Sequence, residues 1–162
     1  MQPLTDSALR SSFVNATKRE ISDLALPLDF AETDWERLDY FGRQDRRSPR
    51  RAFIVVELDD RSVGVMLRKA DAPPRSRAQC SWCQDVYLTN EVVFYSAKRA
   101  GEAGRRGDTI GTLVCAEFGC SANVRKLPPV AYVGFDAEAA RRSRIEGLRE
   151  RSRNFVRSVL VG

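Results

Sequence analysis

The sequence contains no histidine, and this absence excludes more functions than any residue that is present. Without an imidazole the chain cannot form a Cys–His or Ser–His nucleophile pair, cannot use histidine as a general acid or base, and cannot build most catalytic zinc sites. We therefore expect a protein that is not an enzyme.

Long apolar runs are also missing. The longest, such as residues 53–56, have the length of a strand, whereas a bilayer span needs roughly 20 residues. Residues 1–6 lack a basic stretch followed by an apolar core, the pattern of a secretory signal. We therefore expect a cytoplasmic protein with no membrane partner, in a compartment where thiols stay reduced.

Lysine is scarce, because 23 of the 27 basic residues are arginine; the net charge is +5. The planar guanidinium suits phosphates and carboxylates, so this excess favours an RNA-rich or acidic protein partner. An arginine-biased codon usage explains the same excess equally well. With 43% hydrophobic and 30% charged residues, the 162-residue chain has the composition of a globular protein.

The first part of the chain predicts helices and one hairpin. Apolar spacing favours a helix over residues 5–18, and Thr33-Asp34-Trp35-Glu36 has the pattern of a capping box that opens a short helix, Asp34 to Phe41, stopped by Gly42. Trp35, Leu38 and Phe41 are then core residues. A polar, basic connection over 44–51 leads to strands at 52–58 and 62–68, joined by Asp59-Asp60-Arg61.

A stretch rich in proline and charge, residues 69–78, is the best boundary candidate. It predicts an N-terminal α+β domain over 1–70 and a second domain over 71–162. In the second domain we expect strands at 86–88 and 92–95, joined around Thr89-Asn90. A glycine-rich polar stretch over 100–111, a strand over 112–114 and helical turns over 121–126 should follow. A long helix over 136–160 with an apolar stripe closes the chain; the stripe is Ile145, Leu148, Phe155, Val156 and Val159.

All four cysteines lie in this second domain, as a CxxC (Cys80, Cys83) and a CxxxxC (Cys115, Cys120). Two such pairs can complete a tetrahedral thiolate shell, which suits one Zn²⁺ ion and leaves no open position for water, so the zinc should be structural. A redox CxxC would open a helix in a βαβ unit, and disulfides do not fit the compartment. Iron–sulfur ligation fits the spacing less well.

The order of elements indicates the zinc fold. A CxxC turn is followed by a β-hairpin, a cysteine at a strand end and a cysteine that opens a helix, which is the layout of a treble clef. We therefore predict an α+β fold: N-terminal helices plus a β-hairpin, followed by a treble-clef zinc finger with a long C-terminal helix.

The residues around the last two cysteines resemble a known family. Gly111-Thr112-Leu113-Val114-Cys115, Cys120-Ser121 and Asn123-Val124-Arg125, downstream of a CxxC, are similar to the treble-clef zinc finger of the elongation factor G-binding family. That family includes the FusB-type fusidic acid resistance proteins, and the finger is also known as the C-terminal domain of so-called fibronectin-binding proteins. FusB-type proteins carry an N-terminal helical bundle that this sequence does not predict, which weighs against drug resistance.

The resemblance implies a non-enzymatic zinc protein that binds elongation factor G, the ribosome, or both, through the surface of its zinc domain. Partner-facing residues should then lie on the hairpin and on the short helix around Arg125, and we expect Trp82, Phe118, Arg125 and Lys126 among them. We also expect a monomer. We also expect Trp82 and Phe118 to be partly exposed and Phe94 to be in the core.

A second hypothesis is direct RNA binding by the arginine-rich face of the last helix. Its exposed arginines could neutralise phosphates; they are Arg141, Arg142, Arg144, Arg149 and Arg153. The alternative is a solvated helix face, on which Glu146 and Glu150 pair with nearby arginines.

Overall fold

One antiparallel sheet organises the protein. The computed structural model describes residues 1–72, 76–86 and 90–161, and within them five strands pair in the order β1-β2-β3-β4-β5. The strands are β1 (Phe41–Asp45), β2 (Ser48–Leu58), β3 (Arg61–Lys69), β4 (Val92–Lys98) and β5 (Thr109–Cys115). Neighbours in the chain are neighbours in the sheet, so every step is antiparallel and needs no crossover.

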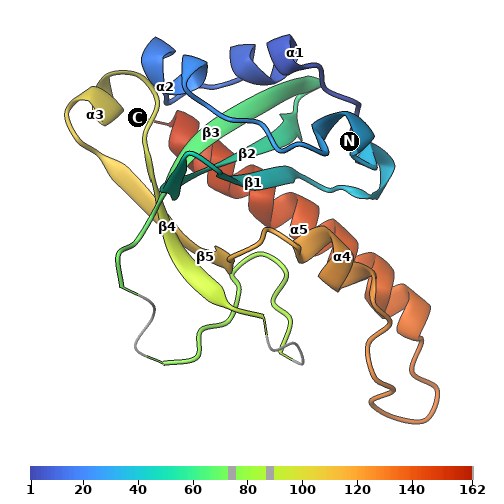
Figure 1. Ribbon diagram of the computed structural model, residues 1–162. Helices are drawn as coiled ribbons and strands as arrows, with labels where there is room; N and C mark the ends of the chain where they lie inside the picture. Colours follow the sequence, from blue (N-terminus) through green and yellow to red (C-terminus); the bar gives the residue numbers. More distant parts are fainter. Residues whose placement is uncertain (73–75, 87–89, 162) are drawn as a thin grey trace.

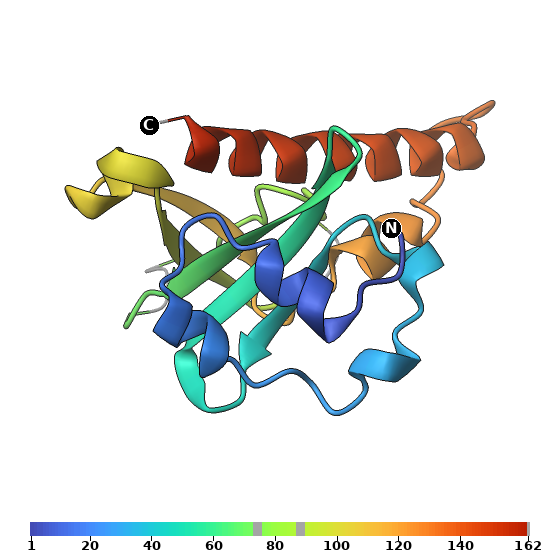
Figure 2. The same cartoon turned by 90° about the horizontal axis from the view of Figure 1, so that it is seen from above.

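Helices lie on both faces of this sheet. Figure 2 shows α5 (Ala137–Leu160) along one face and α1 (Asp6–Ser11) and α2 (Lys18–Ser22) on the other. Short helical segments complete the chain; they are η1 (Phe30–Glu32), η2 (Trp35–Arg37), α3 (Gly101–Arg105) and α4 (Cys120–Arg125). The predicted α+β fold with a long C-terminal helix is therefore confirmed.

Strand alternation divides the core into two clusters. Val63, Val65 and Leu67 of β3 join the cluster beneath α5, whereas Met66 joins the one beneath α1. The α5 cluster contains the four cysteines together with the buried stripe of α5, including Leu148. The zinc ligands predicted from the sequence therefore lie at the edge of the main core.

The predicted hairpin at 52–68 is confirmed. Asp59 and Asp60 have φ values of 49° and 60°, so both central residues adopt the left-handed conformation that two-residue hairpin turns require. In contrast, the predicted connection over 44–51 is wrong, because it forms the end of β1, a turn and the start of β2. A salt bridge between Arg51 and Asp45 spans that turn.

The predicted helix over 5–18 ends early. α1 stops at Ser11, and Phe13 forms a parallel bridge with Gly64 of β3. The Asn15 side chain then accepts from Met66 N at 2.8 Å and donates to Met66 O at 3.0 Å, which extends the pairing to β3. Pairing with the sheet thus outweighs the local helical spacing, and α2 starts afresh from Thr17 with its own capping box.

The predicted capping box at Thr33 and the helix from Asp34 to Phe41 are also wrong. Thr33 ends η1, and η2 is a single 3₁₀ turn that gives way to β1 at Phe41. Trp35 and Phe41 are core residues as predicted. Gly42 lies inside β1, where a Cβ atom would sit 2.8 Å from Phe118 Cδ1, so this glycine serves packing rather than helix termination.

The strand predicted at 92–95 forms a hairpin with β5. β4 pairs along its whole length with β5, and α3 lies within the glycine-rich connection between them. Val86 is not in a strand, and residues 87–89 lie outside the described residues.

The predicted boundary near residue 70 falls in the connection between β3 and the first cysteine pair. β3 and β4 pair across this point through Arg68 with Ser96 and Lys69 with Tyr95, and one hydrophobic cluster contains residues from both sides. Whether the two ranges fold as separate domains stays a prediction.

Candidate metal centre

Four buried cysteine sulfurs gather where three segments meet. Their Sγ atoms all lie within 4.8 Å of one another. Cys80 and Cys83 come from the turn before β4, Cys115 is the last residue of β5, and Cys120 is the first residue of α4. The structure thus brings together both cysteine pairs of the sequence.

The first pair lies in a tight turn. Gln84 N donates to Cys80 O at 3.0 Å, and Gln84 has a φ of 52°, so the chain reverses directly after Cys83. Ser81 N donates to Leu113 O at 2.8 Å, which attaches this turn to β5. The CxxC is therefore held against the strand that carries the third cysteine.

A second reversal joins the other two cysteines. Phe118 N donates to Cys115 O at 2.9 Å, and Phe118 has a φ of 55°, the left-handed conformation. Asn123 N then donates to Gly119 O at 3.1 Å as α4 begins. A strand end and a helix start therefore face the same point, as in a treble clef.

N–H groups donate hydrogen bonds to Cys80 and Cys115. The amides of Trp82 and Cys83 donate to Cys80 Sγ at 3.4 and 3.5 Å. Asn123 Nδ2 donates to Cys115 Sγ at 3.7 Å. Such donors stabilise a thiolate and orient it toward a metal. Asn123 belongs to the motif that carries the family resemblance, but only the folded structure reveals this role.

The sulfurs differ in how readily they ionise. Hydrogen bonds from Cys115 and Cys120 lower the pKa of Cys80 well below its ordinary value. Hydrogen bonding with Cys115, Cys80 and Cys83, together with burial, raises the pKa of Cys120 well above its ordinary value. A cation that draws on all four thiolates must therefore compete with protons for some of them.

The donor set fits zinc. A Zn–S distance of about 2.3 Å places the sulfurs of a tetrahedral site about 3.8 Å apart. The distance from Cys80 Sγ to Cys120 Sγ is 3.6 Å, and that from Cys83 Sγ to Cys115 Sγ is 3.7 Å. The cluster therefore suits one structural Zn²⁺ ion, since four protein ligands close the shell.

The expected exposure of the nearby aromatic residues is wrong. Trp82 and Phe118 are only 2% and 5% exposed, whereas Phe94 is 42% exposed. The Trp82 ring packs against Tyr40 and Phe155, with centroid distances of 5.0 and 5.6 Å, so it belongs to the core beneath α5. Phe94 points away from that core because it alternates with the buried Val93 and Tyr95.

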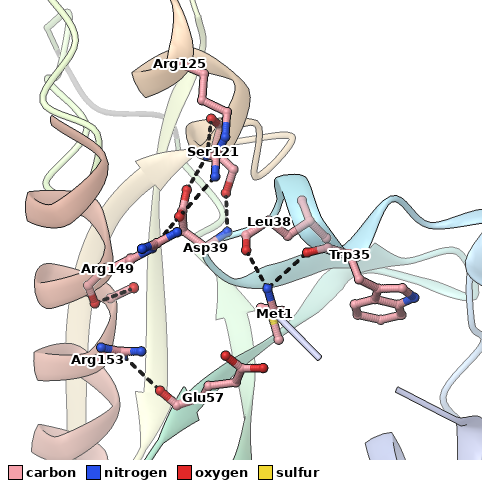
Figure 3. Close-up of polar contacts among 10 residues, drawn as sticks. Met1, Trp35, Leu38, Asp39, Glu57, Ser121, Arg125, Arg149 and Arg153 are labelled. Carbon is pink, nitrogen blue, oxygen red and sulfur yellow. Dashed lines mark hydrogen bonds and ion pairs between the residues drawn. The ribbon is translucent and has the colours of Figure 1, made fainter. Parts of the chain in front are cut away.

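A buried carboxylate ties the zinc helix to the rest of the fold. Figure 3 shows Asp39, just before β1, between Arg125 of α4 and Arg149 of α5. The Asp39 side chain is fully buried. Its Oδ1 accepts hydrogen bonds from Arg125 Nη2 at 3.2 Å and from Arg149 Nε at 2.7 Å. Its Oδ2 pairs with Arg125 Nη1. Asp39 N donates to Ser121 Oγ at 3.0 Å. The guanidinium of Arg125 is thus engaged within the molecule.

Several arginines of α5 also point inward. Arg151 Nε donates to Trp82 O at 2.7 Å, and Arg153 Nε donates to Glu57 O at 2.9 Å (Figure 3). Arg144 pairs with Asp85 and donates to Lys126 O at 3.2 Å. In the described part of the chain, these arginines therefore join α5 to the zinc turn and the sheet. They do not pair with Glu146 or Glu150, as the solvated-face alternative expected.

A mixed antiparallel fold with a four-cysteine centre at a strand end and a helix start defines a treble-clef zinc protein. Comparison with known families agrees: the model of the FBP C-terminal treble-clef zinc-finger family matches residues 8–159, so the chain belongs to that family. The match also takes in most of α1 and the first three strands. No curated protein and no solved structure matches the chain. None of the helices that the structure describes is long and apolar enough to cross a membrane.

Proposed function

We propose that this protein binds elongation factor G, the ribosome, or both, through a surface next to its zinc site. In this proposal all four cysteines ligate one zinc ion, and the ion holds α4 in place. The family resemblance supplies the partner, and the absence of histidine supports a role without catalysis. That the protein is not an enzyme stays a prediction.

The observation that supports this surface is the connection between α4 and α5, residues 127–135. Four large apolar side chains of this loop are exposed; they are Leu127 (56%), Val130 (74%), Tyr132 (66%) and Val133 (103%). Figure 1 shows the loop reaching past the end of α5, away from the sheet. Exposed apolar clusters of this kind mark interaction sites in soluble proteins.

The start of the loop is anchored. Arg125, at the end of α4, is held by Asp39, and Arg144 of α5 donates to Lys126 O. Lys126 itself is exposed and remains on the proposed partner surface. Trp82 and Phe118 are buried, so we now assign them to the support of this surface rather than to direct contact.

The test is binding of purified elongation factor G and of ribosomes to the zinc-loaded protein. We expect Val130→Asp with Tyr132→Ala to weaken binding at least about tenfold, because truncated central anchors typically cost that much. Leu28→Asp is the matched control, since Leu28 is 88% exposed but lies near η1. If neither target binds the wild-type protein, or if Leu28→Asp weakens binding equally, the proposal is wrong.

A further inference from the structure

A basic hollow lies on the face of the sheet opposite α5. It measures about 450 Å³, and strands β2, β3 and β4 contribute most of its lining. The segment from Asn15 to Glu20 borders it on one side. A volume of this order holds a ligand the size of one nucleotide.

The strand register places positive charges together in this hollow. Arg51 of β2 lies directly opposite Arg68 of β3, and Arg68 lies opposite Ser96 of β4. Lys98 follows two residues after Ser96 and therefore shares its face. Like charges directly opposite each other destabilise a sheet unless something offsets them.

Internal carboxylates offset only part of this charge. Arg51 Nε donates to Asp45 Oδ2 at 2.6 Å. Arg68 and Lys98 are exposed, and neither forms an ion pair with a residue in the described ranges. Glu20 also borders the hollow, but Thr17 N donates to its Oε2 at 2.8 Å, which holds that carboxylate at the edge. Glu20 also attracts Lys98 electrostatically, so an external anion would share Lys98 with this carboxylate and would meet Arg68 without such competition in the described ranges.

An exposed aromatic ring lies on the same face of the sheet, outside the residues that line the hollow. Phe94 precedes Ser96 by two residues on β4 and so points to the same face. Its ring covers Gly111 of β5, where any side chain would collide with it. One side of the ring therefore backs onto the strand while the ring stays 42% exposed. Aromatic rings next to cationic grooves are the usual platform for unpaired bases.

We propose that this hollow binds single-stranded RNA, with a phosphate on Arg68 and Lys98 and a base stacked on Phe94. The exposed ring favours RNA over an acidic protein segment, which has no need of a stacking platform. The site lies on the face of the sheet opposite α5. It therefore differs from the surface of α5 on which the sequence hypothesis placed RNA binding. It does not depend on the proposed contact with elongation factor G.

The experiment is fluorescence anisotropy of a labelled ten-nucleotide oligouridine against the zinc-loaded full chain. We expect Arg68→Glu and Lys98→Glu each to weaken binding at least about tenfold and to flatten the logarithmic salt dependence by about 0.7 per lost phosphate contact. Phe94→Leu should cost about tenfold, since it keeps apolar volume but removes stacking. Glu20→Gln should tighten binding, because it removes a repulsive charge and keeps the capping oxygen.

The control and the competitors make the proposal refutable. Arg142→Glu changes the same charge on the exposed side of α5 and should leave binding unchanged. Absence of RNA binding, or an equal loss with Arg142→Glu, would overturn the proposal. So would binding of phosphatidylserine vesicles through Arg68 and Lys98 without binding of RNA.

Competition with uridine monophosphate distinguishes binding of an RNA strand from binding of a free nucleotide. Weak competition by the mononucleotide supports RNA, whereas competition as strong as that of the oligomer supports a free nucleotide with the same chemistry. The sheet variants should retain binding of elongation factor G, so the two proposals fail independently.

Discussion

Replacement of Asp39 tests whether one buried carboxylate holds the zinc helix to the sheet. The side chain of Asp39 is fully buried, and it accepts from Arg125 of α4 and Arg149 of α5. Asp39→Ala removes the carboxylate that both arginines share and leaves their two guanidinium groups without this ion-pair partner. We expect the protein to stay folded but to lose a substantial part of its stability.

The magnitude follows from the exposure of the two arginines. Removing one member of a fully buried ion pair costs about 3–5 kcal/mol. Here the Arg125 and Arg149 side chains are 24% and 48% exposed, so water can solvate part of the abandoned charge. We therefore expect Asp39→Ala to lower the free energy of unfolding by about 2–3 kcal/mol. Arg125→Met should cost more than Arg149→Met, since Arg125 is less exposed and also donates to Ser121 O at 2.8 Å.

The assay is urea unfolding of the zinc-loaded protein, followed by circular dichroism at constant free zinc. Glu138→Ala is the control, because Glu138 pairs with Arg141 on the surface of α5 and should contribute about 0.5 kcal/mol or less. The reasoning is refuted if Asp39→Ala costs no more than Glu138→Ala. A coupling energy near zero between Asp39→Ala and Arg125→Met would also contradict it.

Three further predictions concern the metal, the packing and the boundary. Zinc binding at pH 7 should release at least about one proton per ion, which an indicator dye can measure. The reason is that hydrogen bonding with Cys115 and burial raise the pKa of Cys120, so its thiol stays protonated without metal. Zinc binding without proton release would contradict this prediction. Gly42→Ala should cost about 1–3 kcal/mol of unfolding free energy through collision with Phe118, whereas Gly119→Ala, with nothing within 4 Å, should cost less. The predicted domain 71–162, expressed alone, should bind zinc, but its melting temperature in calorimetry should be lower than that of the whole chain. The reason is that α5 loses its contacts with β2 and β3. Equal melting temperatures would show that those contacts are unnecessary.

The zinc centre was the feature best predicted from sequence, because it depends on few residues at short spacing. A CxxC turn and a CxxxxC reversal are local, so their geometry follows from the chain near them. The long helix α5 could be predicted equally well, since its apolar stripe extends over many turns and Asp136 caps its start.

The failures occur where distant contacts override local signals. Thr33 has the sequence of a capping box, but the chain after it is drawn into β1 by pairing with β2. Trp82 lies in the tight CxxC turn, so the sequence predicted that its side chain is partly exposed. In the structure, Tyr40 and Phe155 pack against the Trp82 ring and bury it. Asp39 gives no sequence signal at all, because its partners lie 86 and 110 residues away.

The same distant contacts explain how the zinc site can present a binding loop. Three residues of the strip from Asp39 to Gly42 lie against the zinc region: Asp39 pairs with Arg125, Tyr40 packs on the Trp82 ring, and Gly42 faces the Phe118 ring. In the proposed zinc-loaded protein, the metal holds α4 at Cys120 and Asp39 holds it at Arg125, so the end of α4 has a defined direction. α5 is tied to the same region, because Arg149 shares Asp39 with Arg125 and Arg151 donates to Trp82 O in the CxxC turn. The apolar loop 127–135 therefore follows a helix that is attached at both Cys120 and Arg125. Loss of zinc should remove the first attachment and weaken partner binding without dissolving the sheet, because the pair of Arg125 with Asp39 and the strand pairing remain.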